Sequence, residues 1–234
     1  MFEFTYDAIV LSYERPGFAA RCVEKIRAAL FPPRRVIVFH NAPSTKRVQH
    51  AVNVFSDVNF SPTARHAIGQ LCRAEACLFV DEDVRVHPEL PALMMDGLKR
   101  HPNSVVGYTG RNMVVGKRPY SGSVDVRNVK EDTPVDIVKG RVHAVRRNLL
   151  GYAALYDLPG ETWREDDIVL NCTIQLAEEE PSYILAGARA SMANDDEEAR
   201  TDVGCSARPD HMERRDAACR AFMAYGWPIR KEPE

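Results

Sequence analysis

Two runs of acidic residues are the groups in this sequence best suited to chemistry: Asp81-Glu82-Asp83 follows a short apolar run, and Glu165-Asp166-Asp167 precedes a longer one. Side chains alternate in direction along an extended chain, so Asp81 and Asp83 can face the same way and offer carboxylate oxygens to Mg²⁺ or Mn²⁺. Either run can instead stabilise the positive end of a following helix. The types and spacing therefore predict a metal site, a catalytic carboxylate, or two helix N-termini.

Strand-like and helix-like segments alternate over the first hundred residues and must position these acids. This order predicts an α/β fold with a Rossmann-like, mostly parallel central sheet flanked by helices. The expected strands are 7–11, 35–39, 51–55 and 76–80, and the expected helices are 17–30, 63–75 and 88–100.

Polar residues follow three of these strands, and the carboxyl ends of parallel strands form one ligand-binding edge. They are Ser12-Tyr13-Glu14-Arg15, His40-Asn41 and Asp81-Glu82-Asp83. We therefore expect one site there rather than three separate features. Residues 1–234 are interpreted as one domain with two halves, 1–110 and 111–234.

The second half has a weaker pattern and predicts a smaller region of sheet and loops. We expect a loop or hairpin over 109–134 that folds over a ligand, and a mobile polar segment at 194–208. The other expected elements are strands at 104–108 and 183–185, a strand pair over 135–145, and helices at 146–157 and from Ile168.

Composition excludes several classes of protein. Lys and Arg number 31 against 33 Asp and Glu, which argues against a general polycation for nucleic acid. The N-terminal residues lack signal-peptide features, no apolar run is long enough to span a membrane, and the six cysteines lack zinc-site spacing. These features predict a soluble cytoplasmic protein with reduced thiols.

From Phe79-Val80-Asp81-Glu82-Asp83-Val84 onward, the sequence resembles the exostosin-type glycosyltransferases. The similarity continues in the same order through most of residues 7–228. Its other parts are Pro88-Glu89-Leu90, residues 105–111, Gly140-Arg141, residues 161–171, residues 211–215, Cys219, Phe222 and residues 225–228.

This resemblance implies a GT-A fold, with a nucleotide-sugar-binding half at 1–110 and an acceptor-side half at 111–234. It also implies a DxD motif, with Asp83 as a direct ligand of Mn²⁺ or Mg²⁺ and Asp81 beside it. The ion would bridge the two phosphates of a UDP-sugar and stabilise the departing diphosphate. Among the residues expected to bind the donor, Arg15 would pair with a phosphate and Asn41 with the base. The others are Ser12, Tyr13, Arg65, Glu82 and Arg111.

On the acceptor side, the resemblance implies that Asp167, with Asp166 as its neighbour, acts on the acceptor hydroxyl or stabilises an oxocarbenium-like transition state. It also implies retention of anomeric configuration. Arg214 or Arg215 would contact the diphosphate, and His211 would be a further metal ligand or phosphate contact.

The sequence also departs from the family. Animal members pair a cysteine near the Asp-Asp-Ile motif with a C-terminal one, whereas here Glu165 occupies the first position and leaves Cys219 without that partner. With this difference, and without signal-peptide or membrane-span features, we expect a cytoplasmic relative of bacterial or viral type. The transferred sugar is expected to be a hexose or N-acetylhexosamine.

The acceptor stays open between a glycan, a lipid-linked saccharide, a small molecule and hydroxymethylated bases in phage-type DNA. The DNA alternative requires a basic groove, for which the candidates are Arg111, Lys117, Arg118, Arg127, Lys130, Arg141, Arg146 and Arg147. A nucleotidyltransferase is disfavoured because Ser12-Tyr13-Glu14-Arg15-Pro16 is not a glycine-rich phosphate loop. A non-catalytic nucleotide-sugar binder would not need both acidic runs.

Overall fold

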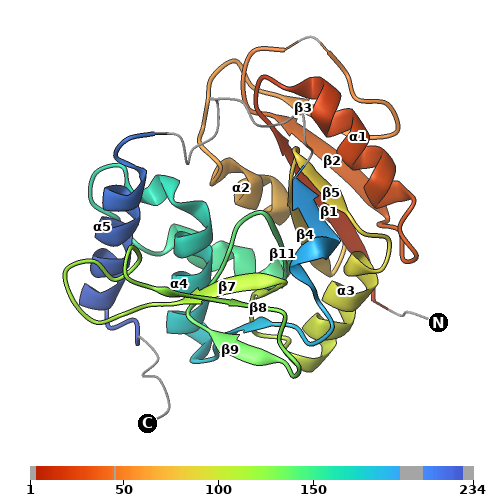
Figure 1. Cartoon of the computed structure of the whole chain (residues 1–234). Helices are drawn as coiled ribbons and strands as arrows, with labels where there is room; N and C mark the ends of the chain where they lie inside the picture. The colour runs from red at the N-terminus through yellow and green to blue at the C-terminus, as the bar shows by residue number, and fades with distance from the viewer. Residues whose placement is uncertain (1–3, 45, 196–207, 229–234) are drawn as a thin grey trace.

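A computed structural model describes residues 4–44, 46–195 and 208–228 of this chain (Figure 1). The strands are β1 Tyr6–Ser12, β2 Arg35–His40, β3 Val52–Phe55, β4 Ala76–Asp81, β5 Val84–Val86, β6 Val106–Gly107, β7 Thr109–Asn112, β8 Val124–Arg127, β9 Thr133–Val135, β10 Ile137–Val138, β11 Val142–Arg146, β12 Ser182–Ile184 and β13 Ala193–Asp195. The α-helices are α1 Pro16–Arg27, α2 Ala64–Gln70, α3 Leu90–Arg100, α4 Asp166–Glu178 and α5 His211–Ala224, and the 3₁₀ helices are η1 Arg147–Ala154, η2 Thr162–Arg164 and η3 Ala190–Met192.

The main sheet has the strand order β3-β2-β1-β4-β11-β6-β12-β9. Its first four strands are mutually parallel, and β11 runs antiparallel to β4. Leu11 pairs with Asp81 and Ser12 pairs with His40, so β1, β2 and β4 end at one edge. The predicted α/β fold and the shared strand-end edge are therefore confirmed.

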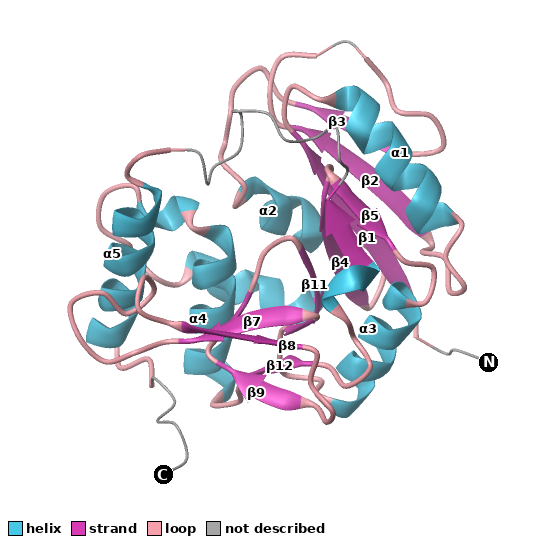
Figure 2. Cartoon of the chain, in the orientation of Figure 1, coloured by secondary structure: helices cyan, strands magenta, loops and turns pink. Residues whose placement is uncertain are grey.

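Hydrophobic residues fill both faces of this sheet because its strands are buried and their side chains alternate. Val10 points into a core that includes residues of α1 and α3, whereas the neighbouring Ile9 points into one that includes residues of η1 and α4. Figure 2 shows the resulting layers, with helices on either side of the strands. This packing fixes the strand ends, from which the polar loops extend.

The second half of the chain differs in detail from its predicted elements. Residues 109–134 do form a hairpin, in which β7 and β8 pair and join β10 in a separate three-stranded sheet. The predicted strand 104–108 is shorter because the chain leaves the main sheet after Gly107. The predicted helix 146–157 is a 3₁₀ helix over Arg147–Ala154. The segment expected to be mobile falls mainly on residues 196–207, outside the described residues.

Two further findings concern the class of protein. In the part of the chain that the structure describes, no helix is both long and apolar enough to span a bilayer. The five cysteines within the described ranges, Cys22, Cys72, Cys77, Cys172 and Cys219, are buried free thiols.

Candidate active site

Asp81 is the last residue of β4, and Glu82 and Asp83 form the turn to β5, so the first acidic run does not begin a helix. Glu82 is buried, and its carboxylate accepts hydrogen bonds from the Tyr13 backbone N–H at 3.0 Å and from Arg15 Nε at 2.8 Å. Arg15 Nη2 also lies 3.3 Å from Asp83 Oδ2. Glu82 and Arg15 therefore tie the loop after β1 to the turn after β4.

The protein environment of this turn favours the protonated form of the Asp81 and Glu82 carboxyl groups, compared with the same groups in water. Burial, together with the charges of Asp83 and Asp166, raises the pKa of Asp81 to about 6 against the opposing effect of Arg65. Burial likewise raises the pKa of Glu82 to about 7, although Ser12 and Arg15 oppose the shift. A bound cation would offset the cost of ionising Asp81, because an adjacent positive charge favours the carboxylate form.

Arg65 joins the two acidic runs. Its Nη1 lies 2.7 Å from Asp81 Oδ1, and its Nη2 lies 2.6 Å from Asp166 Oδ2. Only 3% of this arginine is exposed, whereas an arginine on a helix is usually solvated. The carboxylates of Asp81 and Asp166 raise the pKa of Arg65 against the effect of its burial, so it is a fixed positive charge between the two runs.

The second acidic run lies at the start of α4, where Glu165 is the N-cap residue. Arg215 Nη2 contacts both carboxylate oxygens of Asp167, at 2.8 and 2.7 Å, and Arg215 Nη1 donates to Glu165 at 3.1 Å. Arg214 Nε lies 3.1 Å from Glu165 as well. Burial alone would raise the pKa of Asp167, but Arg215 holds this pKa below its ordinary value. Asp167 is therefore a buried carboxylate that carries its charge near neutral pH.

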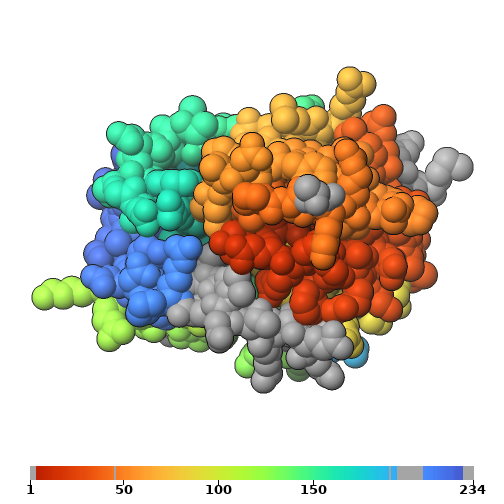
Figure 3. Space-filling model, turned by 90° about the horizontal axis from the view of Figure 1, so that it is seen from above, coloured from red at the N-terminus to blue at the C-terminus, as the bar shows by residue number. Residues whose placement is uncertain are grey.

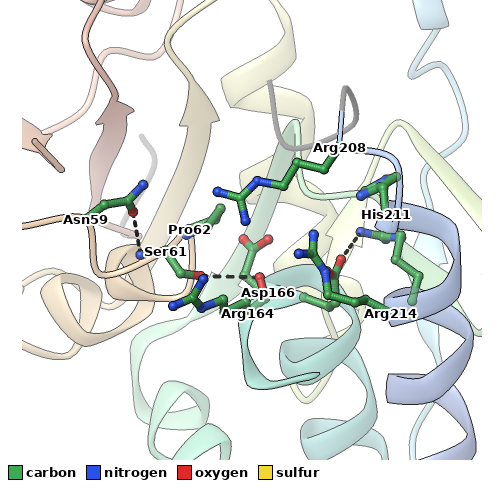
Figure 4. A pocket seen from close by; sticks show the side chains of 10 residues that line it. Asn59, Ser61, Pro62, Arg164, Asp166, Arg208, His211 and Arg214 are labelled. Carbon is green, nitrogen blue, oxygen red and sulfur yellow. Dashed lines mark hydrogen bonds and ion pairs between the residues drawn. The ribbon is translucent and has the colours of Figure 1, made fainter. Parts of the chain in front are cut away.

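Two cavities adjoin these groups. Figure 3 shows the molecule from above, with the red and orange N-terminal segments on one side and the blue C-terminal segment on the other. The larger cavity, of about 440 Å³, lies at the carboxyl ends of β1 and β2 and is lined by Ser12, Glu14, Pro16, His40, Ala42, Pro43, Ser44 and Lys46. The smaller, of about 60 Å³, is lined by Asn59, Ser61, Pro62, Arg164, Glu165, Asp166, Arg208, His211, Arg214 and Arg215. Figure 4 shows the arginines of the smaller cavity around Asp166.

Some predicted site residues lie outside both cavity linings. Asn41 holds the loop before α2, since its amide nitrogen donates to Asn59 and to the Ser61 carbonyl and its oxygen accepts from the Phe60 N–H. Its hydrogen bond to a base therefore stays a prediction that would require these contacts to change.

Arg111 reaches the site indirectly through an aromatic ring. Its guanidinium carbon lies 4.8 Å from the Tyr120 ring centroid, and that of Arg215 lies 4.1 Å from the same ring. Asp216 of α5 holds this part of the hairpin by accepting the backbone N–H groups of Tyr120 and Ser121. The hairpin is thus anchored beside the acidic run of α4.

Four residues at or beside the site were not predicted from the sequence: Gly140, Tyr120, Arg164 and Arg208. Gly140 donates its N–H to Asp167 Oδ2 at 3.2 Å and accepts from Arg65 Nη1 at 3.1 Å. A Cβ there would lie only 3.3 Å from the Asp167 Cβ, so a glycine lets the two charged groups approach. The resemblance to exostosin-type enzymes includes Gly140-Arg141 and could have indicated a site role for Gly140. Nothing in the sequence distinguished Tyr120 or Arg208.

The basic residues suggested for a DNA groove are not gathered in one place. Val142 pairs with Val80 and Arg146 pairs with Ala76, so Arg146 and Arg147 lie at the opposite end of β11 from the strand-end site. Arg111 is also neutralised by Asp125, with Arg111 Nε 2.9 Å from Asp125 Oδ1. This arrangement gives the DNA alternative no specific support.

Asp81 and Asp83 have the chemistry expected of a divalent-cation site. Their side chains are 32% and 27% exposed, which leaves oxygen atoms accessible to an ion. Across the described ranges, no cluster of three or more His, Cys, Asp or Glu side chains is arranged to hold a metal. Mg²⁺ commonly takes only one or two carboxylates and completes its coordination with waters and substrate phosphates, so this pair fits such an ion.

Comparison with known proteins places the fold. No protein-family profile matches the sequence, and no curated protein matches it significantly. Among solved structures, TarS 1–349 from S. aureus has a TM-score of 0.53 at 18% identity, with 78% of this chain and 60% of that chain covered. A second S. aureus TarS structure has a TM-score of 0.57 at 16% identity, covering 79% and 36% of the two chains.

The structure of GalNAc-T7 with UDP, GalNAc and Mn²⁺ has a TM-score of 0.59 at 10% identity, covering 77% of this chain and 41% of that chain. The chain therefore spans at most 60% of the length of these neighbours. These proteins are glycosyltransferases of the GT-A type, and together with the helix-flanked, mostly parallel sheet they show that this chain has the GT-A fold.

Proposed function

We propose that this protein is a metal-dependent glycosyltransferase that moves a hexose or N-acetylhexosamine from a UDP-sugar to an acceptor hydroxyl. The observation that carries the proposal is Arg65, which joins the strand-end acid Asp81 to the helix-end acid Asp166. One edge of a GT-A sheet thus holds a partly exposed carboxylate pair beside a buried carboxylate cluster. The UDP, GalNAc and Mn²⁺ bound to GalNAc-T7 support the same donor chemistry.

In this proposal the nucleoside occupies the larger cavity, which lies at the carboxyl ends of β1 and β2, where α/β sheets bind ligands. Asp81 and Asp83 hold Mn²⁺ or Mg²⁺, which when bound neutralises the charge that develops on the departing diphosphate. Arg15 contacts Asp83 and would exchange this partner for a phosphate, which a guanidinium can bind in bidentate fashion. The predicted contact of Arg214 or Arg215 with the diphosphate would require that side chain to exchange its ion pair with Glu165 or Asp167.

Asp167 stabilises positive charge in this proposal instead of removing a proton. A carboxylate whose pKa is lowered by Arg215 is a weak base, but it keeps its negative charge throughout the reaction. Such a charge favours the oxocarbenium-like transition state of glycosyl transfer. Asp166 orients Arg65, and the resemblance to exostosin-type enzymes predicts retention of anomeric configuration.

A panel of nucleotide sugars with Mn²⁺ tests the proposal through donor hydrolysis and thermal unfolding. A donor present at 100 times its Kd should add about 2.7 kcal/mol to the stability of the folded protein. Metal-dependent stabilisation by UDP-sugars with slow hydrolysis is the expected result. Stabilisation without hydrolysis would indicate a non-catalytic binder, and turnover of nucleoside triphosphates would indicate a nucleotidyltransferase.

A further inference from the structure

The smaller cavity contains nitrogen atoms that lack partners. Arg164 Nε, His211 Nδ1 and Arg215 Nε are buried and have no hydrogen-bond acceptor among the described residues. All three side chains line this cavity, and Arg215 is only 7% exposed. Buried donors are normally satisfied, so these atoms indicate a ligand with acceptor oxygens.

The charge of the lining also favours an anion. Four guanidinium groups, those of Arg164, Arg208, Arg214 and Arg215, face only two carboxylates, those of Glu165 and Asp166. Arg208 has no partner in the part of the chain that the structure describes, and its side chain extends over Asp166 (Figure 4). Arg214, Arg215 and Arg65 already pair with Glu165 and Asp166, and Arg164 Nη1 lies 3.3 Å from the exposed Glu161. Arg208 and the unpartnered Nε of Arg164 are left to bind a further negative group.

Size and position distinguish this cavity from the proposed nucleoside site. Its volume of about 60 Å³ has room for one small oxyanion or a few waters. It shares no lining residue with the larger cavity, and Asp81 and Asp83 line neither. Asp166 lies in its wall, next to the carboxylate proposed to act on the transferred sugar.

We infer that the smaller cavity binds the phosphate or carboxylate group of an anionic acceptor, held by Arg164, Arg208 and His211. This assignment rests on the proposed function and names the substrate class of the same site. The acceptor hydroxyl would then enter from the α5 side of the site, while the UDP-sugar enters from the side of β1 and β2.

Sulfate is the probe for this test because it is a tetrahedral oxyanion that remains soluble with Mn²⁺. Its binding is measured by calorimetry at constant ionic strength, with and without saturating UDP and Mn²⁺. We expect sulfate to bind equally well in both conditions and about tenfold more weakly to Arg208→Ala, because a charge-assisted contact is lost. Arg73→Ala is the matched control, since Arg73 is exposed and lines neither cavity.

Displacement of sulfate by UDP and Mn²⁺ would assign the cavity to the donor diphosphate and overturn the inference. So would equal binding by Arg208→Ala and wild type, which would indicate nonspecific association. If UDP fails to bind under every condition while sulfate binding still depends on Arg208, the glycosyltransferase proposal and the acceptor assignment both fall, and only an anion site remains. In transfer assays, Arg208→Ala should raise the KM for an anionic acceptor about tenfold with little change in kcat.

Discussion

The two acidic runs have similar sequences but different surroundings. Asp81 and Asp83 lie on a strand-end turn, are about one-third and one-quarter exposed, and are each paired with one arginine. Asp166 and Asp167 lie in the first turn of α4 and are 7% and 5% exposed, and Asp167 is held by both contacts of Arg215 Nη2.

This difference explains why the two runs suit different tasks. Burial raises the pKa of Asp81, whereas Arg215 lowers the pKa of Asp167. In the first run, Asp83 can exchange Arg15 for a metal ion at modest cost, because partly exposed ion pairs are weak. The second cannot lose its arginine without leaving a buried charge unpaired, so it provides a fixed negative charge.

The largest expected effect that separates the two runs is on catalysis. Asp167→Asn should lower the rate of sugar transfer roughly a hundredfold to a thousandfold, because it removes the charge that we propose stabilises the transition state. Single-turnover assays with a bound UDP-sugar measure this effect apart from binding. Transfer at the wild-type rate would remove Asp167 from the mechanism.

The second effect is on stability. Asp167→Ala should lower the free energy of unfolding by about 3–5 kcal/mol, since Arg215 loses its main partner in a buried site. Asp83→Ala, the matched variant in the first run, should cost less than about 1 kcal/mol because its ion pair is partly solvated. Urea unfolding of both variants makes the comparison, and equal costs would mean that the two runs are not different environments.

A smaller effect is expected at the glycine between the two runs. Gly140→Ala places a Cβ 3.3 Å from the Asp167 Cβ and 3.4 Å from Arg65 Nη2, and overpacking of this kind costs about 1–3 kcal/mol. Transfer should fall more than UDP binding does. Gly151→Ala is the control because nothing lies within 4 Å of its added Cβ, and a similar loss in both variants would contradict a specific role for Gly140.

The smallest effect concerns pH, and its sign differs between the runs. The pKa of Asp81 is raised from 3.8 to about 6, so its contribution to stability is complete below pH 3.8 and is lost as the pH rises through about 6. The pKa of Asp167 is lowered, so its contribution is present above pH 3.8 and is lost as the pH falls through that lowered pKa.

Without metal, Asp81→Asn should therefore gain stability relative to wild type between pH 4 and 7, on the order of 1 kcal/mol. Asp167→Asn should show its deficit across that same range and approach wild type only in stronger acid. Urea unfolding at several pH values measures both trends. Parallel curves for Asp81→Asn and wild type would contradict the raised pKa.

The sequence predicted those elements of the fold that depend on the local pattern of apolar and polar residues. Buried apolar runs and helical spacing predicted β1, β2, β4 and their helices, and parallel pairing then brought the strand-end groups together. A site role for the two acidic runs was also predictable, because clustered negative charges require positively charged partners.

The remaining parts depend on contacts between residues far apart in the chain. Tyr120 lies between Arg111 and Arg215 only because Asp216 anchors the hairpin to α5. No local spacing encodes that contact. The short strands of the second half also lack period, because tertiary pairing rather than propensity determines them.

Calorimetric titration of UDP with Mn²⁺ into wild type, Asp83→Ala and Asp167→Asn tests the division of tasks most directly. We expect Asp83→Ala to lose Mn²⁺-dependent UDP binding. We expect Asp167→Asn to bind UDP with near wild-type affinity but to transfer sugar far more slowly than wild type. Normal Mn²⁺-dependent binding by Asp83→Ala, together with its loss in Asp167→Asn, would reverse the roles given to the two runs and contradict the account.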